Sequence, residues 1–154
     1  MRLTTIQSKD ILDIIKEKGV YRADYELVGY DEYKEQYKRL ADFCGFSNCP
    51  IFCAPSDDDT SLYGIKEDEN HIRIELEIPK DRAQEMGYYD WSSYLCFSSG
   101  IEVYDEDLDF TPEEALENID SYVVLGKSDI PQFCIQEIYP KDIVNKEILG
   151  GSQL

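Results

Sequence analysis

The segment from His71 to Pro79 constrains the fold most, because apolar and polar side chains alternate along it. Isoleucine and leucine occupy every second position, and arginine and glutamate stand between them. A period of two places these sets on opposite faces of a β-strand. The segment therefore predicts a strand that is buried on one face only, and such a strand needs neighbouring strands and a core to cover it.

Helix and strand patterns on both sides of this segment predict the rest of the fold. A short strand is expected over residues 2–7, followed by a helix from about Ser8, its N-cap, to a terminating Gly19. A second helix is predicted from Asp31 to Cys44, with its tyrosines at the spacing of a core-facing stripe. Further strands are expected over residues 49–54, 92–97, 101–104, 121–125 and 132–138, and a third helix from Thr111.

These elements are interspersed, but the helices are too few to connect every pair of strands by a crossover. We therefore expect an α+β fold with a mostly antiparallel or mixed sheet and about three helices. The chain of 154 residues is long enough for one domain, expected over residues 1–149, with a flexible tail at 150–154.

The overall charge restricts the function of the chain. Thirty-three Asp and Glu face fifteen Lys and Arg, so the formal net charge is −18. Direct binding to nucleic acid or to an anionic membrane relies on Lys and Arg, and is therefore not expected. No apolar run reaches the ~18 to 20 residues of a membrane span, and the amino terminus does not resemble a secretory signal. We expect a cytoplasmic protein of a bacterial host cell, with its five cysteines reduced.

The acidic residues are concentrated in residues 83–126, which contain eleven Asp and Glu and neither Lys nor Arg. A string of carboxylates several ångströms apart can imitate the phosphates of one nucleic-acid strand. The residues expected to bind a partner in this way are Asp105, Glu106, Asp107, Asp109, Glu113, Glu114, Glu117 and Asp120. Calcium is a weaker interpretation, because the segment lacks the spacing of an EF-hand loop.

The leading functional hypothesis is therefore a non-enzymatic interaction protein without a cofactor. It would occupy the basic groove of a nucleic-acid-binding protein and inhibit that protein by nucleic-acid mimicry, as anti-CRISPR or anti-restriction proteins of phages and mobile elements do. The alternative is that the acidic segment only keeps an ordinary housekeeping protein in solution. The oligomeric state is not predicted.

Motifs for catalysis are scarce. Neither a phosphate-binding glycine loop nor a G-x-S-x-G nucleophile elbow occurs. The only histidine, His71, stands at the start of the alternating strand, where an exposed side chain is the ordinary interpretation. Zinc would need Cys44, Cys49 and Cys53 to converge, but their spacings of five and four favour buried structural thiols instead.

Several segments resemble the uncharacterised bacterial and phage family described as domain of unknown function 3841. The resemblance rests on RLTTIQ, KGVYRAD, YDEYKEQYKRL, CPIF, IRIELEIPKD and the pair Asp90-Trp91, in that order. It covers most of residues 1–95 and extends to the closing QFCIQEI. This family implies no activity for the chain.

The opening strand with an arginine, followed by a turn into an amphipathic helix, is also similar to small ADP-ribosyltransferase-like folds. This similarity implies NAD as the cofactor, with Arg2 and either Glu75 or Glu77 as the binding and catalytic residues. The chain departs from that pattern because its E-x-E pair lies in mid-chain and because it has no S-T-S strand. An NAD-using enzyme, or its inactive relative, is the alternative function, and alternating glutamates on a solvent-facing strand are the simpler interpretation of the pair.

Overall fold

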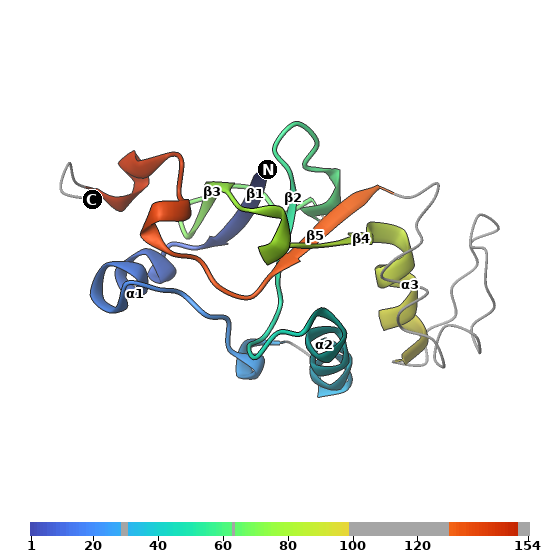
Figure 1. The fold of residues 1–154 in the computed structure, drawn as a ribbon. Coiled ribbons are helices and arrows are strands. Elements are labelled where there is room, and N and C mark those ends of the chain that lie inside the picture. Colours follow the sequence, from blue (N-terminus) through green and yellow to red (C-terminus); the bar gives the residue numbers. More distant parts are fainter. Residues whose placement is uncertain (29–30, 63, 99–129, 151–154) are drawn as a thin grey trace.

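The alternating segment forms β3 (His71–Glu77), the first strand in the order β3-β1-β2-β5-β4 of a five-stranded antiparallel sheet (Figure 1). The computed structural model describes residues 1–28, 31–62, 64–98 and 130–150. The other strands are β1 (Arg2–Ser8), β2 (Ile51–Pro55), β4 (Gln84–Gly87) and β5 (Pro131–Ile135). Together with three α-helices they confirm the predicted α+β fold.

β1 pairs very differently with its two neighbours. It pairs with β3 along its whole length, from Arg2 opposite Glu77 to Ser8 opposite His71. Its pairing with β2 is limited to two residue pairs, of which the last joins Thr4 to Ala54. Beyond Thr4 the two strands diverge, and this divergence positions the candidate site described below.

The helix after β1 is α1 (Asp10–Lys18), which begins slightly later than predicted. Lys9, not Ser8, occupies the N-cap position, and the Ser8 hydroxyl accepts a 3.3 Å hydrogen bond from the Asp10 backbone N–H. Gly19 ends the helix with φ of +73°, in the left-handed conformation that glycine adopts without strain. The predicted termination is therefore confirmed.

Of the other two helices, the sequence predicted one correctly and the other wrongly. α2 (Asp31–Cys44) has the bounds that its apolar spacing predicted. α3 (Tyr88–Ser98) contains residues 92–97, where a strand was predicted, and that prediction is wrong. Trp91, Tyr94 and Leu95 follow helical spacing and are all buried, so packing of one helix face overrides the β-propensity of the aromatic run.

The remaining predicted elements at 101–104, 111 onward and 121–125 lie outside the described residues, as do residues 151–154 of the expected tail. Short 3₁₀ turns complete the described chain: η1 (Tyr25–Leu27), η2 (Thr60–Leu62), η3 (Lys80–Arg82), η4 (Pro140–Asp142) and η5 (Lys146–Leu149). No helix within the described ranges is long and apolar enough to cross a membrane.

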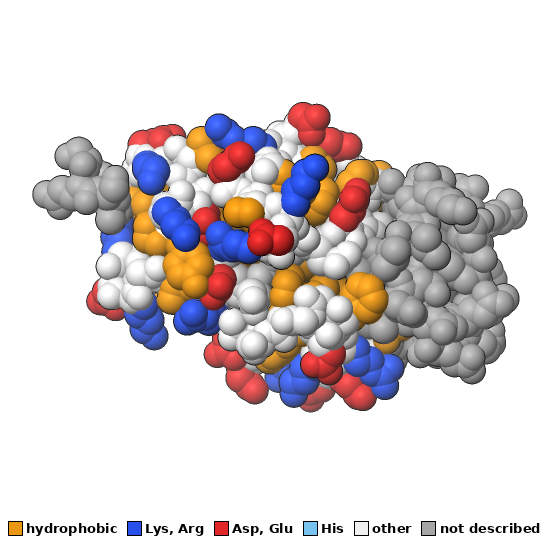
Figure 2. Space-filling view, in the orientation of Figure 1, with side chains coloured by type: hydrophobic (Ala, Val, Ile, Leu, Met, Phe, Trp, Pro, Cys, Tyr) orange, Lys and Arg blue, Asp and Glu red, His pale blue; other side chains and the backbone are white. Residues whose placement is uncertain are grey.

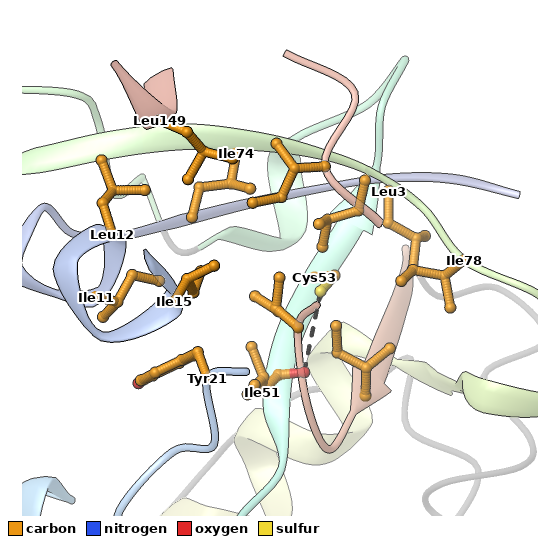
Figure 3. Close-up of a cluster of buried hydrophobic side chains, with 14 residues drawn as sticks. Leu3, Ile11, Leu12, Ile15, Tyr21, Ile51, Cys53, Ile74, Ile78 and Leu149 are labelled. Carbon is orange, nitrogen blue, oxygen red and sulfur yellow. Dashed lines mark hydrogen bonds between the residues drawn. The ribbon is translucent and has the colours of Figure 1, made fainter. Parts of the chain in front are cut away.

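The sheet separates two apolar clusters, because neighbouring residues of a strand face opposite sides. On one side, Ile51 and Cys53 of β2 pack with α1, as Figure 3 shows for Ile11 and Ile15. On the other side, Phe52 packs against the cluster that α2 and α3 form around Leu40, Met86, Trp91, Tyr94, Leu95 and Cys134. Both faces of the sheet are thus covered.

The cysteines of the described chain are free thiols within these clusters or at their edges. Burial raises the pKa of Cys53 to about 12 and, with the nearby Asp24 charge, that of Cys49 to about 11. Cys134 is also fully buried. Cys49, Cys53 and Cys134 are buried, as the sequence predicted, and Cys44 is half-buried. No three His, Cys, Asp or Glu side chains of the described residues converge.

Candidate functional site

A cavity of about 580 Å³ opens where β1 and β2 diverge. Its walls come from the second half of β1, the segment around η1, the first half of β2, and η2, with two tyrosines of α2. The Thr5 hydroxyl donates a 2.9 Å hydrogen bond to the Phe52 carbonyl and so bridges the two strands after their backbone pairing has ended. The volume lies within the ~300–1,000 Å³ that is usual for sites of small molecules.

Most of the cavity wall is apolar or aromatic. Ile6 and Leu62 belong to one small buried cluster, and Phe52 lies beside Tyr37 with ring centroids 5.3 Å apart. Tyr21 closes the side toward α1, and its burial raises the pKa of its hydroxyl. Such walls suit a flat, apolar ring.

Among the described residues, one buried polar atom of the wall lacks a partner. Ser61 of η2 is fully buried, and its Oγ has no hydrogen bond to any described residue. The polar wall residues Thr5 and Gln7, in contrast, are hydrogen-bonded to each other, because the Gln7 amide donates to the Thr5 hydroxyl at 2.9 Å. An unpaired buried hydroxyl costs roughly 1–3 kcal/mol, so a polar ligand group that reached the Ser61 Oγ, after a shift of the side chains that cover it, would gain a hydrogen bond.

Gln132 of β5 is hydrogen-bonded to Ser61. Its Nε2 donates a 3.0 Å hydrogen bond to the Ser61 carbonyl, which fixes the position of η2. The Gln132 side chain is fully buried, and its Oε1 also has no partner among the described residues. Two unpaired oxygen atoms therefore belong to residues that this single hydrogen bond joins.

The described part of the cavity rim carries one charge. Asp24 is the only charged side chain among the described residues of the wall, and its Oδ1 accepts a 2.9 Å hydrogen bond from the Glu26 backbone N–H. Two exposed apolar side chains also belong to the wall, Leu27 at 79% exposure and Ile65 at 49%. The entrance is thus acidic and apolar.

The structure places the three residues that the similarity to ADP-ribosyltransferase-like folds implied on one face of the β1–β3 pair, and it shows contact between two of them. The Arg2 Nε lies 2.8 Å from the Glu77 carboxylate, and both side chains are more than half exposed. Glu75 lies on the same face of the β1–β3 pair, where its Oε2 accepts hydrogen bonds from Thr4 and Ser56 at 2.7 and 2.9 Å. None of the three lines the cavity.

The predicted acidic partner surface lies outside the described residues, since all eight of its carboxylates fall within 99–129. In the described part of the acidic segment, Glu85 is exposed and Asp90 is buried. Figure 2 shows acidic and basic side chains intermixed on the face in view, without a patch of one sign. The mimicry hypothesis therefore still depends on the sequence.

Comparisons of the chain with protein-family models, with curated proteins and with solved structures found no match.

Sequence reasoning missed Ser61, Gln132 and Asp24. A serine after an Asp-rich turn and a glutamine in an apolar strand carry no motif, and Asp24 resembles an ordinary capping residue. The tyrosines of α2 were predicted to face the core. Tyr33 and Tyr37 do pack against the second cluster, but they also line the cavity.

Proposed function

We propose that the chain binds a nicotinamide nucleotide, with the carboxamide-bearing ring in the cavity between β1 and β2. The observation that carries the proposal is the buried Ser61 Oγ, which has no partner among the described residues, in a wall that is mostly apolar and aromatic. A primary carboxamide offers N–H donors and an acceptor oxygen on a flat ring. It can therefore pair with the hydroxyl while the ring covers the apolar wall.

Binding does not require turnover. In the enzymatic form of the proposal, the bond between the ring nitrogen and the ribose carbon breaks, nicotinamide leaves, and an acceptor nucleophile takes the ADP-ribose and loses a proton. Glu75 or Glu77 would stabilise the positive charge on the ribose carbon, and Arg2 would pair with a phosphate. Because Arg2 already pairs with Glu77 outside the cavity, binding without transfer is the simpler form.

The test compares Ser61→Ala with Ser47→Ala, an exposed serine outside the cavity wall. Calorimetric titration with nicotinamide and with NAD should show binding to the unchanged protein and to Ser47→Ala. Ser61→Ala should bind at least several-fold more weakly. Its free energy of unfolding should be unchanged or higher, because the lost hydroxyl has no partner among the described residues. Failure of the unchanged protein to bind either compound at millimolar concentration would contradict the proposal.

A second candidate function follows from the composition of residues 83–126, which contain eleven Asp and Glu and neither Lys nor Arg. In this proposal the segment occupies the basic groove of a nucleic-acid-binding protein and competes with its nucleic acid. Association would be fast and would weaken as salt rises, because it depends on long-range attraction between opposite charges.

The matching experiment replaces Asp105, Glu106, Asp107 and Asp109 by Asn or Gln. The control makes the same change in charge at Asp57, Asp58, Asp59 and Glu69, in the exposed loop between β2 and β3. A partner retained by the tagged protein should be released both by salt and by excess nucleic acid, and only the first variant should fail to retain it. Equal retention by both variants would exclude this function.

A further inference from the structure

Asp24 gives the cavity a negative charge that is held at its rim. Its side chain caps η1, where the Oδ1 accepts the Glu26 backbone N–H at 2.9 Å. The described wall contains no Lys, Arg or His to balance this charge. Arg22, two residues earlier, pairs with Glu137 at 3.2 Å, and Lys34 pairs with the Glu26 side chain at 3.4 Å. The described part of the cavity therefore offers a ligand an anion and no cation.

The charge of Asp24 acts within the cavity as well as at its rim. Burial raises the pKa of Cys49, a wall residue, to about 11, and the Asp24 charge is a further cause. Burial also raises the pKa of Tyr21 on the same wall, with smaller contributions from Cys49 and Asp24. A negative charge raises the pKa of an acid because it opposes the formation of a second negative charge. The same field would attract a cation between these residues.

Aromatic side chains provide a second attraction for a cation. Tyr21, Tyr33, Tyr37 and Phe52 line the wall, and the ring centroids of Tyr37 and Phe52 lie 5.3 Å apart. The π-electrons of aromatic rings attract positive charge, and this attraction becomes stronger where water is excluded. Proteins use aromatic walls of this kind to bind ligands with a quaternary nitrogen. The wall and the rim thus favour an organic cation.

From this arrangement we infer that the cavity selects the oxidised form of an N-ribosyl nicotinamide, whose pyridinium ring is positively charged, and binds the nucleoside more tightly than its phosphorylated forms. The inference rests on the proposed function, keeps its carboxamide-bearing ring and adds the charge that suits the site. Reduction leaves the carboxamide in place but makes the ring neutral, so the attraction to Asp24 and to the aromatic wall would be lost. A phosphate on the ribose would bring negative charge toward a rim that offers Asp24 and, among the described residues, no cation.

The experiment titrates nicotinamide riboside, its reduced form and nicotinamide mononucleotide into the unchanged protein, into Asp24→Asn and into the control Glu26→Gln. Asp24→Asn removes the charge and keeps an oxygen that can accept the Glu26 N–H. Glu26→Gln makes the same change in charge at an exposed side chain outside the wall. We expect the unchanged protein and Glu26→Gln to bind the riboside roughly threefold or more tightly than either of the other compounds. Asp24→Asn should bind the riboside more weakly and lose a large part of both preferences.

Two results would overturn the inference while leaving the proposed function intact. One is a mononucleotide or a reduced riboside that binds the unchanged protein as tightly as the riboside, and the other is an Asp24→Asn variant with both preferences unaltered. If none of the three compounds bound while free nicotinamide did, the inference would fail and only the placement of the ring would remain. If nicotinamide and NAD did not bind either, the proposed function itself would fail, and the inference with it.

Discussion

The Gln132 side chain donates to the Ser61 carbonyl at 3.0 Å, and this hydrogen bond joins residues that are 71 positions apart in the chain. It links β5 to η2 across the end of β2. Because both residues are fully buried, water cannot replace either partner without a change in packing. The position of the unpaired Ser61 hydroxyl in the cavity wall therefore depends on a strand that does not itself line the cavity.

Replacing Gln132 by Leu should destabilise the fold and weaken ligand binding together. The Ser61 carbonyl would lose its donor, and we expect the free energy of unfolding to fall by roughly 1–3 kcal/mol. Urea denaturation gives this value, and titration with nicotinamide gives the affinity. Gln84→Leu is the control, since that side chain donates to a carbonyl in an exposed setting. Equal stability of the two variants would contradict the role assigned to Gln132.

Arg82 should be far more important for stability than Arg2. Its two terminal nitrogens reach the buried Asp142 carboxylate at 2.8 and 2.9 Å, which ties η3 to η4. The substitution Arg82→Ala leaves that carboxylate without its cation. The free energy of unfolding should therefore fall by roughly 1.5–3 kcal/mol. Arg2→Ala removes an exposed pair with Glu77 and should cost less than about 1 kcal/mol. Urea denaturation measures the loss of unfolding free energy in each variant. A larger loss for Arg2→Ala than for Arg82→Ala would contradict this prediction.

Elements whose signals are local could be predicted from the sequence. The alternation in β3, the apolar spacing of α2 and the left-handed Gly19 each depend on a few neighbouring residues. α3 was missed because its aromatic residues have high β-propensity, and only the packing of Trp91 against α2 and β2 favours a helix.

The site itself depends on long-range relations that no local pattern contains. Arg2 lies beside Glu77 because of the register of β1 against β3, and a shift of one residue would place them on opposite faces. The cavity exists because β1 and β2 stop pairing after Thr4. Neither the register nor the divergence can be derived from one sequence, so neither the pairing of Arg2 with Glu77 nor the cavity was predicted.

Acid should loosen the turn before β3 through Asp68. The His71 ring lies 2.9 Å from the Asp68 Oδ1, which also accepts the Asn70 and His71 backbone N–H groups, and these hydrogen bonds lower the pKa of Asp68. A carboxyl with a lowered pKa in the folded state stabilises it above the unfolded value of ~3.9, and this contribution is lost as pH falls through the folded value.

The melting temperature should therefore fall below about pH 4, and Asp68→Asn should make that fall less steep. The amide introduced by this substitution keeps an acceptor oxygen, so the turn itself should survive. Glu69→Gln, an exposed neighbour, serves as the control. Melting curves between neutral and acid pH test this, and an identical acid dependence in Asp68→Asn and the unchanged protein would show that Asp68 does not contribute.

The described thiols should resist modification while the chain is folded. Only the thiolate reacts rapidly, and burial raises the pKa of both Cys44 and Cys53 to about 12, so almost none is present at pH 8. The test uses Cys96→Ser, because the Cys96 side chain lies outside the described part of the chain. A disulfide reagent at pH 8 should label none of the remaining four thiols within minutes, and all four in concentrated urea. Cys44 is the most accessible of them, so its rapid labelling in the folded protein would show that the α2 terminus opens away from β5.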